Sequence, residues 1–333
     1  MQWTDRLGYR LKLRDIHILM AVFEAGSMSK AAQRLSVSPP VVSKAIADIE
    51  HTFGVRMFDR TPQGIEPTIY GRALLDSGLA AFDDLKQGVR QIQFLANPQA
   101  GEVRVGCNEP FAAGLLPAIV ERIGRKYPGI VCHVVPTPSA SRPDLRELRE
   151  RRVDLIVARF DESLEQDFQA KLLYYEQPYL VAGRRSKWLR RQHIELSELV
   201  NERWIVTPPN ALPTAFIERA FQACGAPLPR AAVVSLSIHL SNTLLASGRY
   251  LGVLPGSLLR YGVLRNAVKV LPVEFPAMPG PVGIITLKNR TLSPTVKLFI
   301  EIAQELAQPL CQLQGSRPAK RRRQNGPAKA PSR

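Results

Sequence analysis

Cysteine is scarce in this sequence, and the four that occur lie far apart: Cys107, Cys132, Cys224 and Cys311. No pair forms a C-x-x-C motif, so neither a zinc knuckle nor a redox dithiol is expected. Free thiols are the ordinary interpretation. The alternative is that Cys107 is reactive or lines a ligand site, because it follows a predicted strand. The five histidines are scattered singly, and the sequence predicts no metal ion and no cofactor.

Long apolar runs are missing as well. The stretch 231–240 is among the longest, and it is interrupted by serine and histidine. A membrane-spanning helix needs roughly 18 or more consecutive apolar residues. Residues 1–15 are mixed polar and charged and contain no apolar signal core. We therefore expect a cytoplasmic protein without a membrane partner.

Catalytic motifs are also absent. The sequence contains no G-x-x-x-x-G-K-[ST] phosphate loop, no H-E-x-x-H helix and no G-x-S-x-G turn. No spacing supports a Ser/His/Asp triad or a pair of catalytic carboxylates. With 45% hydrophobic residues the chain can still bury a core. The sequence therefore predicts a folded protein that is not an enzyme.

The sequence is rich in positive charge, with 45 Lys and Arg against 29 Asp and Glu and a net charge of +16. This excess favours a polyanionic partner, and nucleic acid is the first candidate. The charge is uneven, since residues 1–100 hold 12 basic and 10 acidic residues, whereas residues 311–333 hold seven basic residues and no acidic one. Residues 311–333 are predicted to be a disordered basic tail, which either contacts phosphates nonspecifically or only aids solubility.

Residues 14–53 predict three short helices with apolar faces at helical spacing. On the first helix this face holds Ile16, Leu19, Met20 and Phe23. A three-residue turn separates the second helix from the third, which predicts a helix-turn-helix. The predicted helices and the residues at their ends are 14–25, ending at Gly26; 30–35, capped by Ser29; and 39–53, capped by Ser38 and begun by Pro39.

Two short strands, 55–58 and 65–68, follow the third helix and add a wing to this unit. The third helix of a helix-turn-helix lies in the major groove, where Lys44 can reach a guanine edge or a phosphate. Nearby arginines are placed to hold phosphates. The alternative is a three-helix packing unit that binds no DNA. The predicted DNA-binding residues are Ser29, Lys30, Arg34, Ser38, Pro40, Val41, Ser43, Lys44, Arg56, Arg60 and Thr61.

Three segments stand in a fixed order: AGSMSKAA at 25–32, LSVSPPVVS at 35–43 and GVRMFDR at 54–60. Together they resemble the DNA-binding domain of the LysR-type transcriptional regulators. One position departs from that family, which usually has glutamine where this sequence has Pro39. Because proline cannot donate a hydrogen bond, we expect Val41, Ser43 and Lys44 to carry more of the base recognition.

Residues 71–96 predict a long helix with heptad spacing, typical of a coiled-coil seam. Members of the LysR family pair through this linker helix, so the resemblance implies a dimer contact. The alternative is an amphipathic helix packed on its own domain. The predicted dimerisation residues are Leu75, Phe82, Leu85, Val89 and Ile92.

Residues 97–310 alternate strands and helices, which predicts an α/β fold with mainly parallel sheets. This region resembles the family's effector domain, which is like a periplasmic solute-binding protein with a ligand cleft between two lobes. Ligands of such sheets bind beyond the carboxyl ends of strands, where helix N-termini attract anions. Each of these positions could instead be an ordinary loop cap. The predicted effector-binding residues are Cys107, Asn108, Glu109, Thr137, Ser139, Arg159, Phe160, Thr207, Asn210 and Ser237.

The predicted domains are a winged helix-turn-helix at 1–70, a linker helix at 71–96, an effector-binding domain at 97–310 and a basic tail at 311–333. The resemblance implies a homodimeric or tetrameric regulator that binds a pseudo-palindromic promoter site and contacts RNA polymerase. A small organic effector, such as a carboxylate, would switch it. Two alternatives are a solute-binding protein for transport, which would be secreted, and an enzyme on an α/β scaffold.

Replacing Lys44 by alanine should weaken specific DNA binding by about 1–3 kcal/mol if Lys44 contacts a base. The loss should be confined to the cognate sequence, because a lost base contact does not affect binding to random DNA. Fluorescence anisotropy on cognate and random duplexes measures both affinities. An equal loss on every sequence would show that Lys44 holds a phosphate instead.

Overall fold

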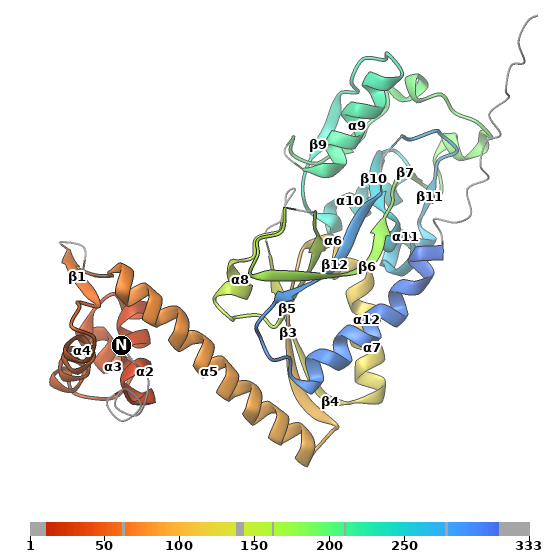
Figure 1. Ribbon diagram of the computed structural model, residues 1–333. Helices are drawn as coiled ribbons and strands as arrows, with labels where there is room; N and C mark the ends of the chain where they lie inside the picture. The colour runs from red at the N-terminus through yellow and green to blue at the C-terminus, as the bar shows by residue number, and fades with distance from the viewer. Residues whose placement is uncertain are drawn as a thin grey trace, which may run out of the picture.

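The computed structural model describes residues 11–61, 64–137, 143–161, 163–209, 211–276 and 279–312. A small N-terminal helical domain lies at one end, and helix α5 (Ile69–Ala96) extends from it to a larger α/β domain (Figure 1). The predicted basic tail lies almost entirely outside the described residues. In the described parts of the chain, no helix is long and apolar enough to cross a membrane.

The N-terminal domain is a winged helix-turn-helix, as predicted. Gly26 and Gly54 end the first and third helices with φ values of 60° and 69°, a left-handed conformation that suits glycine. Ser38 is the N-cap of the third helix, and Pro39 is in its first turn. The elements are α2 (Leu13–Ala25), α3 (Met28–Arg34), α4 (Pro39–Phe53), β1 (Phe58–Thr61) and β2 (Gly64–Pro67).

Three details of this domain differ from the sequence prediction. Ser27 rather than Ser29 is the N-cap of α3. On α2, Phe23 is 41% exposed, while its neighbour Val22 is fully buried. The helix is covered on two sides, by α3 and α4 and by α5, so its buried positions do not follow one stripe. The first wing strand starts at Phe58, three residues later than predicted.

Helix α5 starts on the wing and is about 42 Å long at the usual rise per residue. The hydroxyl of Thr68 caps it by accepting a hydrogen bond from the Gly71 amide at 3.1 Å. Two glycines let it approach its own domain. A Cβ at Gly71 would lie 2.0 Å from the Met57 carbonyl oxygen, and one at Gly78 would lie 2.5 Å from the Ile16 side chain.

The predicted heptad seam of α5 is split between two environments. Leu75 is buried, and the Phe82 ring lies 5.6 Å from the His17 ring of α2, so both pack within their own chain. The burial of Leu75 corrects its assignment as a dimerisation residue and matches the alternative of a helix packed on its own domain. Phe82 is half-buried, and its role in a dimer stays a prediction. Leu85, Val89 and Ile92 are exposed, and for them the dimer contact stays a prediction.

The α/β domain consists of two lobes, each built on a five-stranded sheet. In lobe 1 the helices are α6 (Glu109–Ala113), α7 (Leu115–Lys126), α8 (Arg146–Arg149) and α12 (Pro294–Gln312). The strands of lobe 1, in spatial order, are β4 (Gly129–Pro136), β3 (Ala100–Cys107), β5 (Leu155–Arg159), β12 (Gly280–Leu287) and β6 (Phe168–Glu176).

Lobe 2 is formed by the part of the chain between β6 and β12. Its helices are α9 (Leu212–Ala223), α10 (Ile238–Ala246) and α11 (Gly256–Tyr261), with short 3₁₀ turns η1 (Lys187–Arg190), η2 (Leu196–Leu199) and η3 (Val263–Asn266). Its strands, in spatial order, are β11 (Val268–Val270), β7 (Pro178–Gly183), β10 (Leu251–Pro255), β8 (Trp204–Val206) and β9 (Ala231–Val234).

Both sheets are mixed, which corrects the prediction of mainly parallel sheets. In lobe 1, β3 pairs parallel to β4 and β5, whereas β12 pairs antiparallel to β5 and β6. Lobe 2 likewise has two parallel and two antiparallel pairings. The chain leaves lobe 1 after β6, builds lobe 2 and returns through β12, which therefore runs against its neighbours. Strand β6 was not predicted from the sequence.

Two helices of lobe 1 are shorter than predicted. The segment 110–127, predicted as one helix, breaks at Gly114 into α6 and α7, because the ψ angle of Gly114 is −101°. The helix predicted at 144–150 is the short α8.

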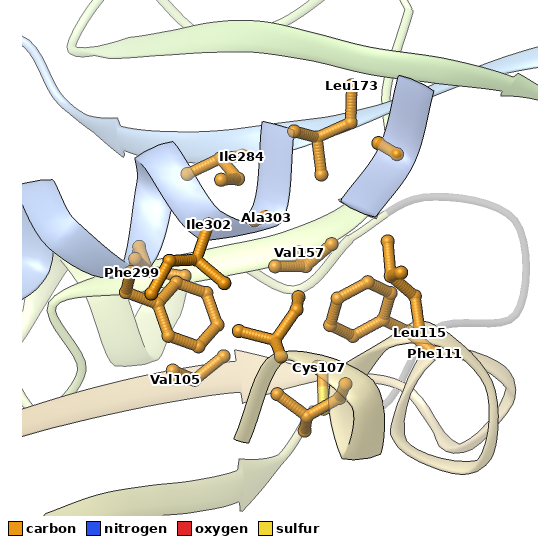
Figure 2. Packing of buried hydrophobic residues seen from close by; sticks show 14 of the residues in the cluster. Val105, Cys107, Phe111, Leu115, Val157, Leu173, Ile284, Phe299, Ile302 and Ala303 are labelled. Atoms are coloured by element: carbon orange, nitrogen blue, oxygen red, sulfur yellow. The ribbon is translucent and has the colours of Figure 1, made fainter. Parts of the chain in front are cut away.

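Apolar side chains from the sheet, from α7 and from α12 form the core of lobe 1 (Figure 2). Phe299 and Ile302 of α12 face Val105 and Val157 of the sheet in this core. Lobe 2 has its own core around Trp204 and Phe221, whose rings meet edge to face at 5.6 Å. Since each lobe has its own core, the two can move as separate bodies.

Alanine at Gly71 should destabilise the N-terminal domain by about 1–3 kcal/mol, because its Cβ would overlap a backbone carbonyl that cannot move aside easily. Gly88, on the same helix, has nothing within 4 Å of the corresponding position. Alanine there should raise stability by up to about 1 kcal/mol through helix propensity. Calorimetry of both variants tests this. Equal effects of the two substitutions would contradict the close approach at Gly71.

Candidate DNA-binding surface and effector cleft

The outward face of α4 presents short polar and apolar side chains. Pro40, Ser43 and Lys44 are exposed near its N-terminus, and Val41 is half-buried. The Ser43 hydroxyl lies 3.5 Å from the Met28 sulfur of α3. No described side chain pairs with the Lys44 ammonium, so it is free to contact a base edge or a phosphate.

Other predicted DNA contacts flank this helix. Ser29, Lys30 and Ser38 are exposed beside α4, and Arg56 is exposed just before the wing. Arg34 pairs with Glu24 at 2.6 Å on an exposed surface, so it would have to exchange this partner for a phosphate. Two residues of the wing strand complete the set: Thr61 is half-buried and donates to the Gly64 carbonyl oxygen, and the side chain of Arg60 lies outside the described set.

A cavity of about 430 Å³ lies between the two lobes, and both contribute its walls. Most of the lining is apolar, which suits an organic molecule with a non-polar body. The polar lining residues include Asn108, Glu109 and Arg159, at the ends of β3 and β5, and Thr207, at the end of β8. The cleft therefore lies where strand ends predict it.

Arg159 is the one cationic side chain among the described residues that line this cavity. It is the last residue of β5, and its guanidinium donates to the Glu176 carbonyl oxygen at 3.4 Å. From lobe 2, the ring of Phe216 lies 5.7 Å from the guanidinium carbon. A Cβ at Gly280 would lie 2.1 Å from Nη2, so only glycine leaves this space to the arginine. Burial lowers the pKa of Arg159, and the carboxylate of Glu176 partly offsets this.

A buried glutamate joins the two lobes beside Arg159. The carboxylate of Glu176, at the end of β6, accepts hydrogen bonds from the Tyr174 hydroxyl at 3.2 Å and from the Ser257 amide at 3.2 Å. The Ser257 hydroxyl also donates to it. Burial raises the pKa of Glu176, although these hydrogen bonds and the charge of Arg159 act in the opposite direction. Sequence reasoning missed Glu176 because β6 itself was not predicted.

Several predicted effector residues have partners within the protein. The Asn108 side chain caps α6 by accepting from the Phe111 amide, and Ser237 caps α10 by accepting from the Leu240 amide. Thr207 hydrogen-bonds Thr214 of α9 at 3.0 Å. The Glu109 carboxylate accepts from the Ile238 amide at 3.0 Å and so connects lobe 1 to lobe 2.

The structure corrects three of the predicted effector contacts. Cys107 is 1% exposed and belongs to the lobe 1 core, beside Phe111 and Leu115 (Figure 2), so it does not line the cavity. Phe160 packs on a second apolar cluster of lobe 1 instead of facing the cavity. Ser237 is likewise not among the lining residues, although its neighbours are. The side chain after a strand end can point either into the sheet's core or out of it, and strand spacing alone left this open.

Thr137 is placed as predicted, in the cavity wall at the end of β4. Ser139 and Asn210 lie outside the described residues. Lobe 2 adds side chains that the sequence did not single out, mainly Phe216 of α9 and Ser241 of α10. Within the described ranges, no group of three or more His, Cys, Asp or Glu side chains could hold a metal ion.

Two family models match this chain. The model described as "LysR substrate binding domain" matches residues 96–308, more than half of the chain. The model described as "Bacterial regulatory helix-turn-helix protein, lysR family" matches residues 13–72. The chain belongs to the LysR family. It is a transcriptional regulator with a helix-turn-helix DNA-binding domain and an effector-binding domain, and it is not an enzyme.

Individual relatives align over most of their length. The uncharacterized HTH-type transcriptional regulator YdcI of Escherichia coli K12 is 26% identical over 302 residues, which cover 90% of this chain and 97% of that protein. The transcriptional dual regulator GltC of Bacillus subtilis 168 is 26% identical over 305 residues, covering 91% and 100%. A full-length OxyR structure from Pseudomonas aeruginosa shares the fold, with a TM-score of 0.58, 21% identity and coverage of 91% and 96%.

Cys107 should be unreactive in the native LysR-family protein. Burial raises the pKa of its thiol to about 11, so on the order of one molecule in a thousand carries the thiolate at about pH 8. Cys224 is exposed and should be alkylated first. Mass spectrometry after brief iodoacetamide treatment, with a denatured sample as control, measures both sites. If both thiols were labelled at the same rate, Cys107 would be a reactive residue after all.

Proposed function

We propose that this regulator responds to a small organic carboxylate held in the cavity between its lobes. The observation that carries the proposal is the placement of Arg159. Its guanidinium is partly buried in a mostly apolar cavity, and its one described hydrogen bond is a long one to a backbone carbonyl. A guanidinium has five N–H donors and binds carboxylates in a bidentate way, so most of its hydrogen-bonding capacity is available to a ligand.

The rest of the cavity suits the apolar body of such a ligand. Phe216, Leu212 and Ile205 of lobe 2 are among its apolar lining residues, and lobe 1 contributes Pro110 and Pro136. A ligand that touches both walls binds the closed arrangement of the lobes better than an open one. This difference in affinity is what allows an effector to shift the protein between two states. The proposal includes no cofactor and no metal ion.

The proposal for the DNA-bound state is a homodimer or tetramer in the cytoplasm. It would bind a pseudo-palindromic promoter site and contact RNA polymerase. Support comes from the exposed apolar side chains of Leu85, Val89 and Ile92, spaced by four and three residues along one face of α5. A second copy of α5 could cover this face. Two α4 helices related by a two-fold axis would then meet two half-sites.

Binding of simple carboxylates tests the effector class. Benzoate and hexanoate are compared with benzamide and hexanamide, which have the same apolar bodies and no charge. We expect at least one carboxylate to raise the melting temperature of the full-length protein and to change its affinity for promoter DNA. The matched amides should do neither, because they cannot form the charged hydrogen bonds with Arg159.

Arg159→Gln should lower the protein's affinity for this carboxylate by about 10-fold to 100-fold. This corresponds to the loss of about 1.5–3 kcal/mol for hydrogen bonds between charged groups. Arg125→Gln is the matched control, since Arg125 lies on the exposed face of α7 and pairs there with Glu121. It should change the affinity by less than about twofold. Two results would rule out Arg159 as the carboxylate-binding residue. One is an equal effect of carboxylates and amides, and the other is a carboxylate affinity that Arg159→Gln leaves unchanged.

A further inference from the structure

A buried cluster of charged side chains joins the linker helix to lobe 1. Asp83 of α5 accepts two hydrogen bonds from Arg290, at 2.7 Å from Nε and 2.9 Å from Nη2. It accepts a third from Arg151, at 2.9 Å. The chain segment between Asp83 and Arg290 includes nearly all of the effector domain. The cluster is therefore a tertiary contact between α5, which follows the DNA-binding domain, and the effector-binding domain.

A second carboxylate completes this cluster. Asp154 is 1% exposed and accepts from Arg290 at 2.8 Å and from Arg90 of α5 at 3.0 Å. Its other oxygen accepts from the Arg104 amide at 2.9 Å. Arg290 also donates to the Val153 carbonyl oxygen at 2.6 Å. We call Asp83, Arg90, Arg151, Asp154 and Arg290 the linker cluster.

The linker cluster requires every one of its charged side chains to keep its partner. Burial raises the pKa of Asp83, but the hydrogen bonds and charges of Arg290 and Arg151 lower it by more, so the carboxylate stays ionised. Removing one partner of a buried ion pair leaves the other charge uncompensated in a medium of low polarity. A small rotation of α5 would therefore break several hydrogen bonds together.

Two strands connect the linker cluster to the effector cavity. Asp154 immediately precedes β5, which ends at Arg159 in the cavity. Arg290 follows shortly after β12, which starts at Gly280 beneath the same guanidinium. The strands are antiparallel neighbours, with Val282 opposite Arg159. The cavity and the cluster are thus at opposite ends of one strand pair, roughly 16 Å apart.

One further polar side chain of α5 is buried beside the linker cluster. Gln87 of α5 is 3% exposed, and its Nε2 donates weakly to Asp83 at 3.4 Å. Within the described part of the chain, its Oε1 is buried without a hydrogen-bond partner.

We propose that the linker cluster is the element that couples the effector cavity to α5 and, through α5, to the DNA-binding domain. Closure of the lobes on Arg159 shifts β5 and β12, and these strands carry Asp154 and Arg290 with them. The displaced charges change the position of α5 on lobe 1. In a dimer, this changes the spacing of the two α4 helices. The inference rests on the proposed function for its biological meaning, but the coupling itself is a property of the chain without any effector.

A double-mutant cycle on the full-length protein tests this coupling without an effector. Arg159→Gln perturbs the cavity end, and Asp83→Asn removes one charge at the cluster end. Hydrogen exchange followed by mass spectrometry measures the protection of residues 83–96 of α5 in the wild type, both single variants and the double variant. Promoter-DNA affinity is measured in parallel.

We expect Asp83→Asn to speed exchange in residues 83–96 by tenfold or more. We expect Arg159→Gln to change exchange there at least fivefold in the wild type and less than twofold in the Asp83→Asn background. Distant substitutions that share no coupled element act independently, within about twofold. If Arg159 and Asp83 had independent structural roles, the effects of the two substitutions on hydrogen exchange would be additive. Non-additive effects would therefore show that the two sites are coupled.

Asp84→Asn is the matched control. Asp84 is the next residue of α5, is exposed, and undergoes the same chemical change. It should leave the exchange of residues 83–96 and its response to Arg159→Gln as in the wild type. If Asp83→Asn fails to fold, Arg290→Lys replaces it, since lysine keeps the charge but cannot form the two parallel hydrogen bonds.

Two outcomes would overturn the inference. One is a strictly additive cycle, and the other is an Arg159→Gln variant whose α5 exchanges as in the wild type. Neither depends on which molecule fills the cavity. Failure of every carboxylate to bind, combined with a non-additive cycle, would instead reject the proposed effector class and leave the coupling in place.

Discussion

The pairing of β5 with β12 is the interaction on which the rest of this structure depends. The two strands are separated by more than a hundred residues, and their hydrogen bonds close the chain after it has built lobe 2. At one end the pair places Arg159 over Gly280 in the cavity. At the other end it places Asp154 beside Arg290, where α5 docks. The effector cavity and the docking site of α5 therefore both depend on this one pair of strands.

Among the residues that the structure describes, the cavity combines a mostly apolar wall with one guanidinium, that of Arg159. In such a site an anion forms stronger hydrogen bonds than it does in water, because little solvent competes. The neighbouring carboxylate of Glu176 is not equally available, since Ser257 and Tyr174 already donate to it. One charge is thus satisfied by the protein and the other is left for a ligand. This asymmetry is the chemical basis of our proposal that the effector is a carboxylate and not an amine.

The DNA-binding domain was largely predictable from local signals. Gly26 and Gly54 mark helix ends because only glycine adopts the left-handed turn without cost, and Pro39 marks a helix start because its missing amide is not needed there. The cleft was predictable in part: the strand ends at Arg159 and Thr137 do line it, while Cys107 and Phe160 turn into apolar clusters. Periodicity alone does not tell which face of a strand end meets a cavity.

The sequence by itself determined the family, the order of the domains and the helix-turn-helix, because each depends on residues close together in the chain. Only the tertiary structure decided which heptad positions stay exposed, since Leu75 is buried and Phe82 packs against His17 of α2, whereas Leu85 is exposed. It also decided the mixed direction of the sheets and the partners of Asp83. These features join residues far apart in the chain, and long-range pairing is set by the packing of whole lobes, which no local pattern encodes.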